Sequence, residues 1–327
     1  MLSDQVCVEV RNLSKIYEIY ARPVHRLMQT LFCGTRHFYR EFRALDNVSF
    51  RVKTGQCFGI IGMNGAGKST LLRMMAGIIR PDQGEILIDD LPVYENEEAK
   101  KLFFYISDDS YFPPNYTAVD MVRFYRNFYP EFRIKLFHEL MDQFHLEKKQ
   151  RISSFSKGMK KQLLVIIGVC AGTKYLLCDE TFDGLDPVMR QAVKSLFASE
   201  IMNREFTPVI ASHNLRELED ICDHVGLLHK GGILLSKDLE DMKFHIHKIQ
   251  CVLGGRQQEK ELEKELQVLK VQHQGSLLMI TARGTRSEIV EKVQAKNPLF
   301  MEVLPLTLEE IFISETEVAG YEIKNLF

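Results

Sequence analysis

The most constraining stretch of the chain is "IIGMNGAGKST" at residues 60–70. Gly62, Gly67, Lys68 and Ser69 fit the spacing G-x-x-x-x-G-K-[ST], with an apolar run before it and a helical pattern after it. Glycines allow backbone N–H groups to turn toward a phosphate, and the N-terminus of the following helix adds partial positive charge. The lysine of this motif reaches the β- and γ-phosphates, and the serine hydroxyl ligates Mg²⁺. The stretch therefore predicts a strand–loop–helix unit that binds a nucleoside triphosphate.

Composition limits what such a site can serve. The chain has 327 residues, enough for about two domains, and its net charge of −2 predicts no bulk attraction to nucleic acid or to an anionic membrane. The longest apolar runs, such as "LLVIIGVCAG", fall short of the roughly 18–20 residues of a membrane span. The first residues lack the pattern of a signal peptide, and the seven cysteines form no CxxC pair, which favours a reducing, cytoplasmic location.

Between residues 6 and 236 the sequence alternates between β-branched apolar runs and segments with helical periodicity. The segments predicted as strands are 6–17, 43–62, 174–179, 208–213 and a hairpin at 224–236. The segments predicted as helices are 68–79, 117–146 with Thr117 as N-cap, a helix from about Gly158, 187–203 and 214–222. Strands alternating with helices predict an α/β fold with a parallel sheet.

The sequence after residue 238 has a different pattern. The predicted elements are strand 246–253, helix 257–269, strand 276–282, helix 285–296, strand 299–304 and helix 307–316. Thr307 and Glu310 form a predicted capping box for the last helix. These elements predict a small α+β unit of the split βαβ kind.

Residues 18–43 interrupt the strand pattern. Pro23 can open a helix with apolar residues at helical spacing, Gly34 can close it, and the opposite face is basic. Such a segment fits either contact with a membrane partner or lipid headgroups, or a cover over the protein's own core.

Two adjacent acids follow the apolar run "LLC". Asp179 ends the predicted strand and suits a carboxylate that holds Mg²⁺, whereas Glu180 is placed to polarise an attacking water. A histidine, His213, ends the next predicted strand. The alternative, a solvated strand end, does not account for this combination with the lysine loop upstream.

The stretch "FSKGMKKQ" places lysines around the first turn of a helix, where the helix dipole opposes them. This placement makes sense if an anion lies in front of the helix. A γ-phosphate fits, held by the hydroxyl of Ser156 and the amides around Gly158. The alternative is a basic surface turn.

Together these stretches resemble the nucleotide-binding subunit of an ABC transporter. "GMNGAGKST" resembles the Walker A loop, "LLCDE" the Walker B motif with its catalytic glutamate, and "FSKGM" the signature motif. "FDGLD" resembles the D-loop, and "ASH" resembles the switch-histidine segment. The resemblance covers residues 6 to about 236. The signature and the tail "PLTLEEIF" resemble ABC-2-type exporters, whereas the flanks of 18–43 are similar to an N-terminal insertion in polysaccharide-exporter cassettes.

The resemblance implies a P-loop NTPase (RecA-like) core with an antiparallel β subdomain and an α-helical signature subdomain at about 110–160. The implied domains are an ABC ATP-binding cassette at 1–237, with the insertion 18–43, and a small C-terminal α+β accessory domain at 238–327.

It also implies a mechanism. ATP and Mg²⁺ are bound between two cassettes packed head to tail, in a homo- or heterodimer. Glu180 activates water and His213 contacts the γ-phosphate. Asp179 and Ser69 hold the metal. The implied nucleotide-binding residues are Tyr17, which stacks on adenine with Tyr20 as substitute, Gly62, Asn64, Gly65, Ala66, Gly67, Lys68, Ser69, Thr70, Ser156, Gly158 and Asp186, which relays between the sites.

The chain departs from the family pattern at two places. Asp108 stands where the Q-loop glutamine is expected, and it remains a candidate Mg²⁺ ligand. Lys157 and Met159 replace Gly and Gln of the signature, whereas Ser156 and Gly158 are retained.

The leading interpretation is therefore an ATPase that powers an exporter. Its transmembrane permease is a separate chain, and its place is the cytoplasmic face of a bacterial membrane, as a peripheral protein. The expected cargo is a drug, a peptide or a cell-envelope polysaccharide. The alternative is a soluble ABC ATPase that acts on a macromolecular complex. Nucleic acid is not expected as a partner.

Overall fold

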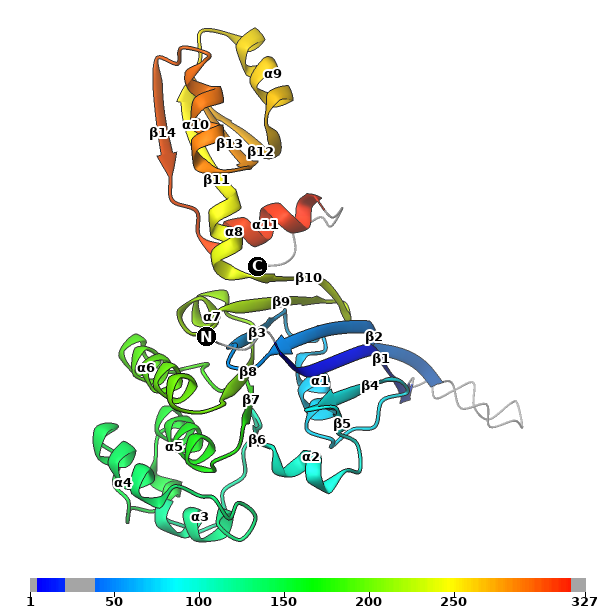
Figure 1. The fold of residues 1–327 in the computed structure, drawn as a ribbon, viewed down its shortest axis with the longest axis vertical. Helices are drawn as coiled ribbons and strands as arrows, with labels where there is room; N and C mark the ends of the chain where they lie inside the picture. The colour runs from blue at the N-terminus through cyan, green and yellow to red at the C-terminus, as the bar shows by residue number, and fades with distance from the viewer. Residues whose placement is uncertain (1–4, 21–38, 319–327) are drawn as a thin grey trace, which may run out of the picture.

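The structure is a computed structural model that describes residues 5–20 and 39–318. Within these residues the strands form three sheets, two in a larger body and one in a smaller unit at its end (Figure 1). The helices α8 (Leu239–His245) and α11 (Leu308–Val318) join the two parts.

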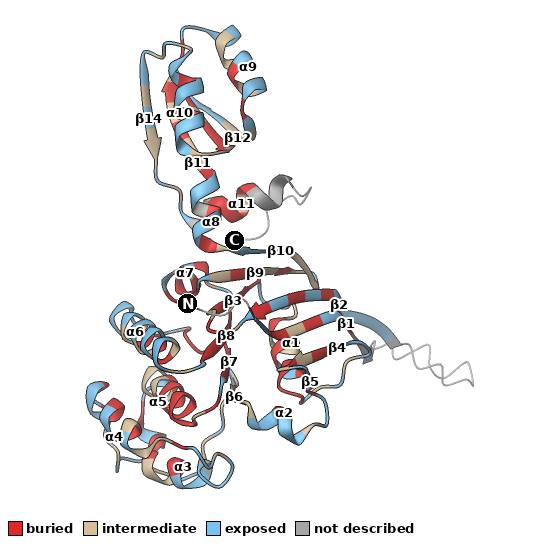
Figure 2. Cartoon of the chain, viewed as in Figure 1, coloured by how far each residue is buried: buried red, intermediate tan, exposed pale blue. Residues whose placement is uncertain are grey.

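The central sheet has the strand order β10-β9-β3-β8-β7-β6. Its strands are β3 (Phe58–Ile61), β6 (Phe103–Ile106), β7 (Tyr175–Asp179), β8 (Thr207–Ser212), β9 (His224–His229) and β10 (Gly232–Asp238). Neighbouring strands from β9 to β6 pair in parallel, and β10 pairs with β9 as the predicted hairpin. Every residue of β3, β7 and β8 is buried, as expected for parallel strands covered on both faces (Figure 2). The predicted α/β fold is confirmed.

A second, antiparallel sheet has the order β2-β1-β4-β5. Its strands are β1 (Val6–Tyr20), β2 (Tyr39–Lys53), β4 (Gln83–Ile88) and β5 (Leu91–Pro92). The helix α1 (Lys68–Met75) shares one buried cluster with side chains of both sheets. This packing holds the loop in front of α1 between them.

The strand pattern continues further into the 18–43 stretch than we expected. Glu18 pairs with Glu41 and Tyr20 with Tyr39, so both ends of the stretch extend the β1–β2 pair. The helix predicted from Pro23 to Gly34 lies outside the described residues. The insertion as a whole stays a prediction.

The helices beside the central sheet are α2 (Glu97–Lys101), α3 (Ala118–Tyr125), α4 (Ile134–Gln143), the 3₁₀ turn η1 (Ile152–Ser154), α5 (Lys157–Cys170), α6 (Pro187–Asn203) and α7 (Leu215–Ile221). The capping box predicted at Thr117 is present, with Asp120 as its partner. A continuous helix over 117–146 was wrong, because the chain leaves the helix after α3. Pro130 lies in the break, and the residue before a proline disfavours helical backbone.

The C-terminal unit contains β11 (Ile246–Val252), α9 (Arg256–Glu265), β12 (Gln267–Gln274), β13 (Leu277–Arg283), α10 (Arg286–Gln294) and β14 (Phe300–Leu304). Its sheet order is β12-β13-β11-β14, with every pair antiparallel. This is the β-α-β-β-α-β arrangement of a split βαβ unit.

The predicted helix 257–269 was wrong beyond Glu265, where α9 ends. The strand β12, which begins at Gln267, was missed. Leu262, Leu266 and Leu269 recur at helical spacing. The half-buried edge strand β12 shows no clean alternation that could reveal it.

Two helices connect this unit to the larger body: α8 (Leu239–His245) and α11 (Leu308–Val318). Leu239, Met242, Ile311 and Phe312 belong to the buried cluster that also contains side chains of α5 and α7. The Thr307–Glu310 capping box predicted for α11 is present. The buried cluster around α8 and α11 contains residues from both sides of position 237, and the C-terminal sheet has a buried cluster of its own. The domain boundary at 237/238 stays a prediction. None of the helices in the described part of the chain is long and apolar enough to cross a membrane.

Candidate active site

The loop between β3 and α1 leaves no room for side chains at two glycines. A Cβ on Gly62 would lie 2.6 Å from the carbonyl oxygen of Leu228, and one on Gly67 would lie 2.5 Å from that of Ala44. Gly67 also has a φ of 108°, which disfavours any other residue. The glycines therefore let the loop pack against β2 and β9 while the first turn of α1 stays open in front.

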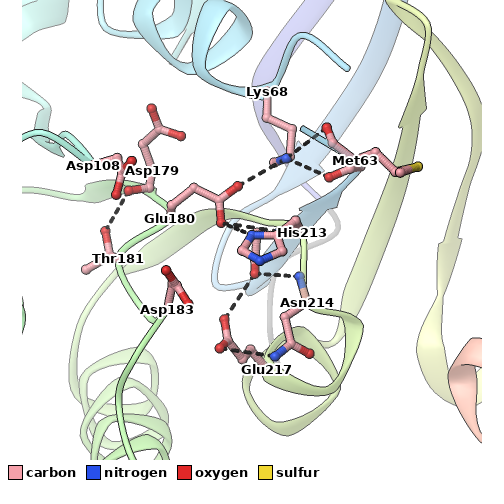
Figure 3. Close-up of polar contacts among 12 residues, drawn as sticks. Met63, Lys68, Asp108, Asp179, Glu180, Thr181, Asp183, His213, Asn214 and Glu217 are labelled. Atoms are coloured by element: carbon pink, nitrogen blue, oxygen red, sulfur yellow. Dashed lines mark hydrogen bonds and ion pairs between the residues drawn. The ribbon is translucent and has the colours of Figure 1, made fainter. Parts of the chain in front are cut away.

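Lys68 is 5% exposed, and its ammonium lies under this loop. It donates hydrogen bonds to the carbonyl oxygens of Gly62 (2.6 Å) and Met63 (3.2 Å). Its Nζ also lies 3.1 Å from Oε1 of Glu180 (Figure 3). A buried ammonium needs such partners because desolvation of an unpaired charge is costly.

Glu180 links this lysine to His213. The Oε2 of Glu180 lies 2.8 Å from Nδ1 of His213 and also accepts a hydrogen bond from the His213 amide at 3.3 Å. Glu180 and His213 directly follow the neighbouring parallel strands β7 and β8, so their side chains meet at the carboxyl edge of the sheet. A parallel α/β sheet typically binds ligands at this edge.

Asp179 ends β7 and is fully buried. Its Oδ1 accepts a hydrogen bond of 3.0 Å from the Ser69 hydroxyl, and the hydroxyl of Tyr105 donates to Oδ2 at 3.4 Å. Burial raises the pKa of the Asp179 carboxyl above its ordinary value, and the hydrogen bond from Ser69 opposes this shift. A buried carboxylate beside a hydroxyl has the oxygen donors that Mg²⁺ prefers.

Asp108 follows β6 and faces the same region (Figure 3). Its side chain is 54% exposed, and its Oδ1 lies 3.8 Å from the Nζ of Lys161. Within the described residues, no group of three His, Cys, Asp or Glu side chains is arranged to hold a metal ion. The candidate donors are thus one buried carboxylate, one hydroxyl and one exposed carboxylate.

A cavity of about 400 Å³ lies in front of the loop. The predicted site residues that line it are Asn64, Gly65, Gly67, Lys68, Ser69, Thr70, Asp108, Glu180 and His213. Gly62 and Ala66 shape the loop behind it, where Ala66 is buried. The structure thus brings together residues from four distant chain segments around one cavity.

Ser156 and Gly158 are positioned differently. Ser156 is the N-cap of α5, and its hydroxyl accepts a hydrogen bond from the Met159 amide at 3.1 Å. Neither residue is among the described residues that line the cavity, although Lys157 between them is. Lys157 lies 3.8 Å from Asp183, another cavity residue. The N-terminus of α5 therefore stands at the rim of the cavity in its own chain.

Asp186 is the exposed N-cap of α6, and its carboxylate accepts a hydrogen bond of 2.9 Å from the Met189 amide. It lies on the same turn as Asp183. Its proposed relay role involves a second chain, and the helix cap is the contact seen within this one.

The aromatic candidates divide between two strands. Tyr17 on β1 pairs with Phe42 on β2, and the ammonium of Lys15 lies 5.6 Å from the centre of the Tyr17 ring. Among the described residues lining the cavity, Phe42 is present and Tyr17 is not. The side chain of Phe42 is 45% exposed. Sequence reasoning missed Phe42, because strand pairing across the 18–43 stretch places it there.

Sequence reasoning also missed a polar network behind His213. The Ser212 hydroxyl donates a hydrogen bond of 3.0 Å to the Glu217 carboxylate. The same hydroxyl oxygen accepts a hydrogen bond of 3.0 Å from the Asn214 amide. Burial raises the pKa of the Glu217 carboxyl. The network fixes the turn that carries His213 (Figure 3). An acid four residues beyond a histidine gives no sequence signal for this role.

Comparison with known proteins agrees with these motifs. The family model described as "ABC transporter" matches residues 45–183. The chain is 29% identical over 273 residues to the ABC transporter ATP-binding protein YtrB of Bacillus subtilis (strain 168), covering 84% of this chain and 93% of YtrB. It is 30% identical over 208 residues to the bacitracin transport ATP-binding protein BcrA of Bacillus licheniformis, covering 63% of this chain and 68% of BcrA.

The fold is similar to that of solved cassettes. The dimeric structure of MJ0796, a bacterial ABC transporter cassette, superimposes with a TM-score of 0.58 at 19% identity. The match covers 71% of this chain and 98% of that one. The expected cassette fold is thereby confirmed for the larger body.

Proposed function

Because the chain belongs to the ATP-binding subunits of the ABC transporter family, we propose that it powers an exporter whose membrane-spanning permease is a separate chain. Proteins of this family are ATPases whose hydrolysis is coupled to transport. The proposal also names the residues that catalyse hydrolysis, the way two cassettes assemble and the class of cargo.

One observation carries the catalytic assignment: the carboxylate of Glu180 bridges Lys68 at 3.1 Å and His213 at 2.8 Å. For Lys68 to bind a β- or γ-phosphate, its ammonium must exchange the carboxylate for phosphate oxygens. That exchange frees Glu180 to accept a proton from water. The same contact therefore links nucleotide binding to release of the general base.

In the reaction we assign, water attacks the γ-phosphorus and passes a proton to Glu180. The bond from the γ-phosphorus to the bridging oxygen breaks, leaving ADP and inorganic phosphate. Lys68 and the loop amides stabilise the charge on the phosphate oxygens, and His213 orients the γ-phosphate.

Mg²⁺ is assigned to Asp179 and Ser69, with Asp108 as a further candidate. The buried Asp179 carboxylate and the half-buried Ser69 hydroxyl fit a hard cation that takes one or two protein ligands plus phosphate oxygens. When bound, the ion neutralises phosphate charge. The burial of the Asp179 carboxylate beside the Ser69 hydroxyl supports this assignment, because a nearby cation would offset the burial of its charge.

The second part of the proposal is a head-to-tail pair of cassettes. Its support is the N-terminus of α5, where Ser156 and Gly158 are not among the described residues that line their own cavity, whereas Lys157 between them is. A helix N-terminus exposed in this way can bind the γ-phosphate of a second chain. The solved cassette MJ0796 is described as dimeric.

The permease contact is assigned to the helical region around α3. Tyr111, Phe124 and Phe128 expose 76%, 44% and 61% of their surface, and the rings of the two phenylalanines lie 5.2 Å apart. Clustered exposed aromatic side chains are typical of a protein contact surface. The segment that joins this region to β6 carries Asp108, so docking there can reach the cavity. This contact would hold the chain at the cytoplasmic face of a bacterial membrane.

For the cargo, we favour a drug or a peptide. The support is the relative BcrA, whose name describes bacitracin transport. The polysaccharide alternative depends on the stretch 18–43, most of which lies outside the described residues.

The test is the dependence of ATP hydrolysis on protein concentration. We expect the specific activity of the purified chain to rise with concentration, and light scattering in Mg²⁺ and ATP to report a dimer. Co-expression with a candidate permease should shift this curve to lower concentrations. Full activity of a strictly monomeric particle would contradict the paired-cassette proposal.

A further inference from the structure

The helix α5 carries a buried lysine that none of the motif assignments uses. Lys161 is 6% exposed, in the second turn of α5. Its ammonium donates a hydrogen bond of 2.5 Å to the main-chain carbonyl oxygen of Glu180. The Nζ of Lys161 also lies 3.8 Å from Oδ1 of Asp108. A buried ammonium needs strong acceptors, and the Glu180 carbonyl is the nearer of these two.

The backbone at Glu180 is in an uncommon conformation. Its φ is 47°, in the left-handed region that residues other than glycine rarely occupy. Such a residue is held in place by its surroundings, and here both flanking peptide groups are bonded. The Glu180 amide donates to the carbonyl oxygen of Ala211 at 2.9 Å, and its carbonyl accepts from Lys161.

These two bonds determine where the side chain of Glu180 points. With both peptide planes fixed, the carboxylate is directed at Lys68 and His213 rather than along the strand. Without the bond from Lys161, the peptide after Glu180 is free to rotate toward an ordinary conformation, and the carboxylate would move with it.

We propose that Lys161 is a positioning residue for Glu180, and that it links the signature helix to the general base within one chain. The inference rests on the proposed function, because Ser156 at the N-cap of the same helix is there assigned to the nucleotide of the opposite cassette. A shift of α5 upon that contact is transmitted through Lys161 to the Glu180 carbonyl. Contact of α5 with the nucleotide of the opposite cassette thereby adjusts the general base Glu180 of its own cassette.

The neighbouring lysine offers a matched control. Lys160 is on the same helix but lines a surface groove with Tyr111 and Ser153. The ion pair with Asp108 contributes less than the carbonyl bond, because the side chain of Asp108 is more than half exposed and solvent weakens the pair.

The experiment compares the full-length Lys161→Met, Lys161→Arg and Lys160→Met variants in steady-state hydrolysis and in binding of a fluorescent ATP analogue. We expect Lys161→Met to lower kcat at least about ten-fold with KM and analogue affinity within about two-fold, because a misdirected base affects the chemical step. Lys161→Arg should recover most of kcat, since it keeps a cationic donor. The control Lys160→Met should stay within about three-fold of the unsubstituted chain.

A kcat of Lys161→Met within about two-fold of the unsubstituted chain would overturn the proposal, as would a parallel loss of analogue binding. If Lys161→Met does not fold, Lys161→Gln takes its place with the same expectations.

Hydrogen exchange of the peptide 176–184 separates this proposal from the proposed function, because it needs no turnover. We expect faster exchange in Lys161→Met and unchanged exchange in Lys160→Met. Unchanged exchange in both would refute the positioning role even in an inactive protein.

Discussion

The carboxyl edge of the central sheet and the C-terminal βαββαβ unit are both sheets with helices packed on them, yet they treat polar side chains in opposite ways. At the sheet edge, Lys68, Asp179 and Ser212 are buried, and burial raises the pKa of the Asp179 carboxyl. In the C-terminal unit, Ile249, Ile280 and similar apolar side chains form the core. Its acid Glu288 caps α10 at the surface of the unit.

The helix caps make this contrast concrete. Glu288 and Thr285 form the capping box of α10, and hydrogen bonds from Thr285 lower the pKa of the Glu288 carboxyl. Ser156 caps α5 in the same local geometry but stands beside the nucleotide cavity. The same local motif therefore serves stability alone in one region, and stability together with a proposed ligand contact in the other.

The largest expected effect is at Glu180. Glu180→Gln should lower kcat on the order of 10²- to 10⁴-fold, the range for loss of a general base. ATP affinity should rise, because the amide no longer competes with phosphate for Lys68. Steady-state hydrolysis and equilibrium nucleotide binding measure the two effects.

Glu302→Gln in the C-terminal unit is the matched change for Glu180→Gln, and it should leave both quantities unchanged. Wild-type turnover in Glu180→Gln would remove the assigned base and, with it, the contrast between the regions.

The second effect is at Ser156. Ser156→Arg should abolish hydrolysis while nucleotide binding by the isolated chain persists, because the side chain is assigned to the opposite site. Activity and binding assays with a fluorescent ATP analogue distinguish the two. Thr285→Arg removes the equivalent cap in the other region and should cost roughly 1 kcal/mol of stability with hydrolysis intact. Loss of binding in Ser156→Arg would mean that the site lies within one chain.

A smaller effect concerns adenine. Phe42→Ala should weaken ATP binding by about 1–2 kcal/mol, or roughly 5- to 30-fold, because base stacking on an aromatic ring is of this size. Tyr17→Ala should change binding less, as its ring does not line the cavity among the described residues. Titration with ATP and with inorganic triphosphate separates the base from the phosphates. A larger loss in Tyr17→Ala would restore the original assignment.

The smallest effect is on stability, and its sign differs between the regions. The pKa of the Asp179 carboxyl is raised in the folded chain, so the folded state disfavours its ionisation. The folded state therefore loses stability as the pH rises from the ordinary pKa of the carboxyl through its raised pKa. Asp179→Asn should therefore raise Tm near neutral pH, with an advantage that disappears toward about pH 4, where the carboxyl is protonated in both states.

Glu288→Gln should lower Tm near neutral pH, because the pKa of that carboxyl is lowered on folding and its ionised form is favoured. Thermal unfolding across pH measures both variants. If both variants raised Tm near neutral pH, or both lowered it, burial would not distinguish the two regions.

Local signals were enough for much of the fold. The helix predicted at 187–203 matches α6, and the caps at Thr117 and Thr307 are present, since capping depends on residues three positions apart. The break before Ile134 was missed although Pro130 marks it locally. The strand β12 was missed because it depends on pairing with β13, which the leucine spacing around Leu266 does not reveal.

By itself, the sequence determined the phosphate-binding loop, the order of the motifs and the alternation of strands and helices, because each is written in contiguous residues with a fixed spacing. Tertiary structure alone decided that Glu180 meets both Lys68 and His213, that Phe42 rather than Tyr17 lines the cavity, and that Lys161 holds the Glu180 carbonyl. The physical reason is distance along the chain. Strand pairing and helix packing bring these groups together, and no local pattern encodes which side chains meet across a sheet edge.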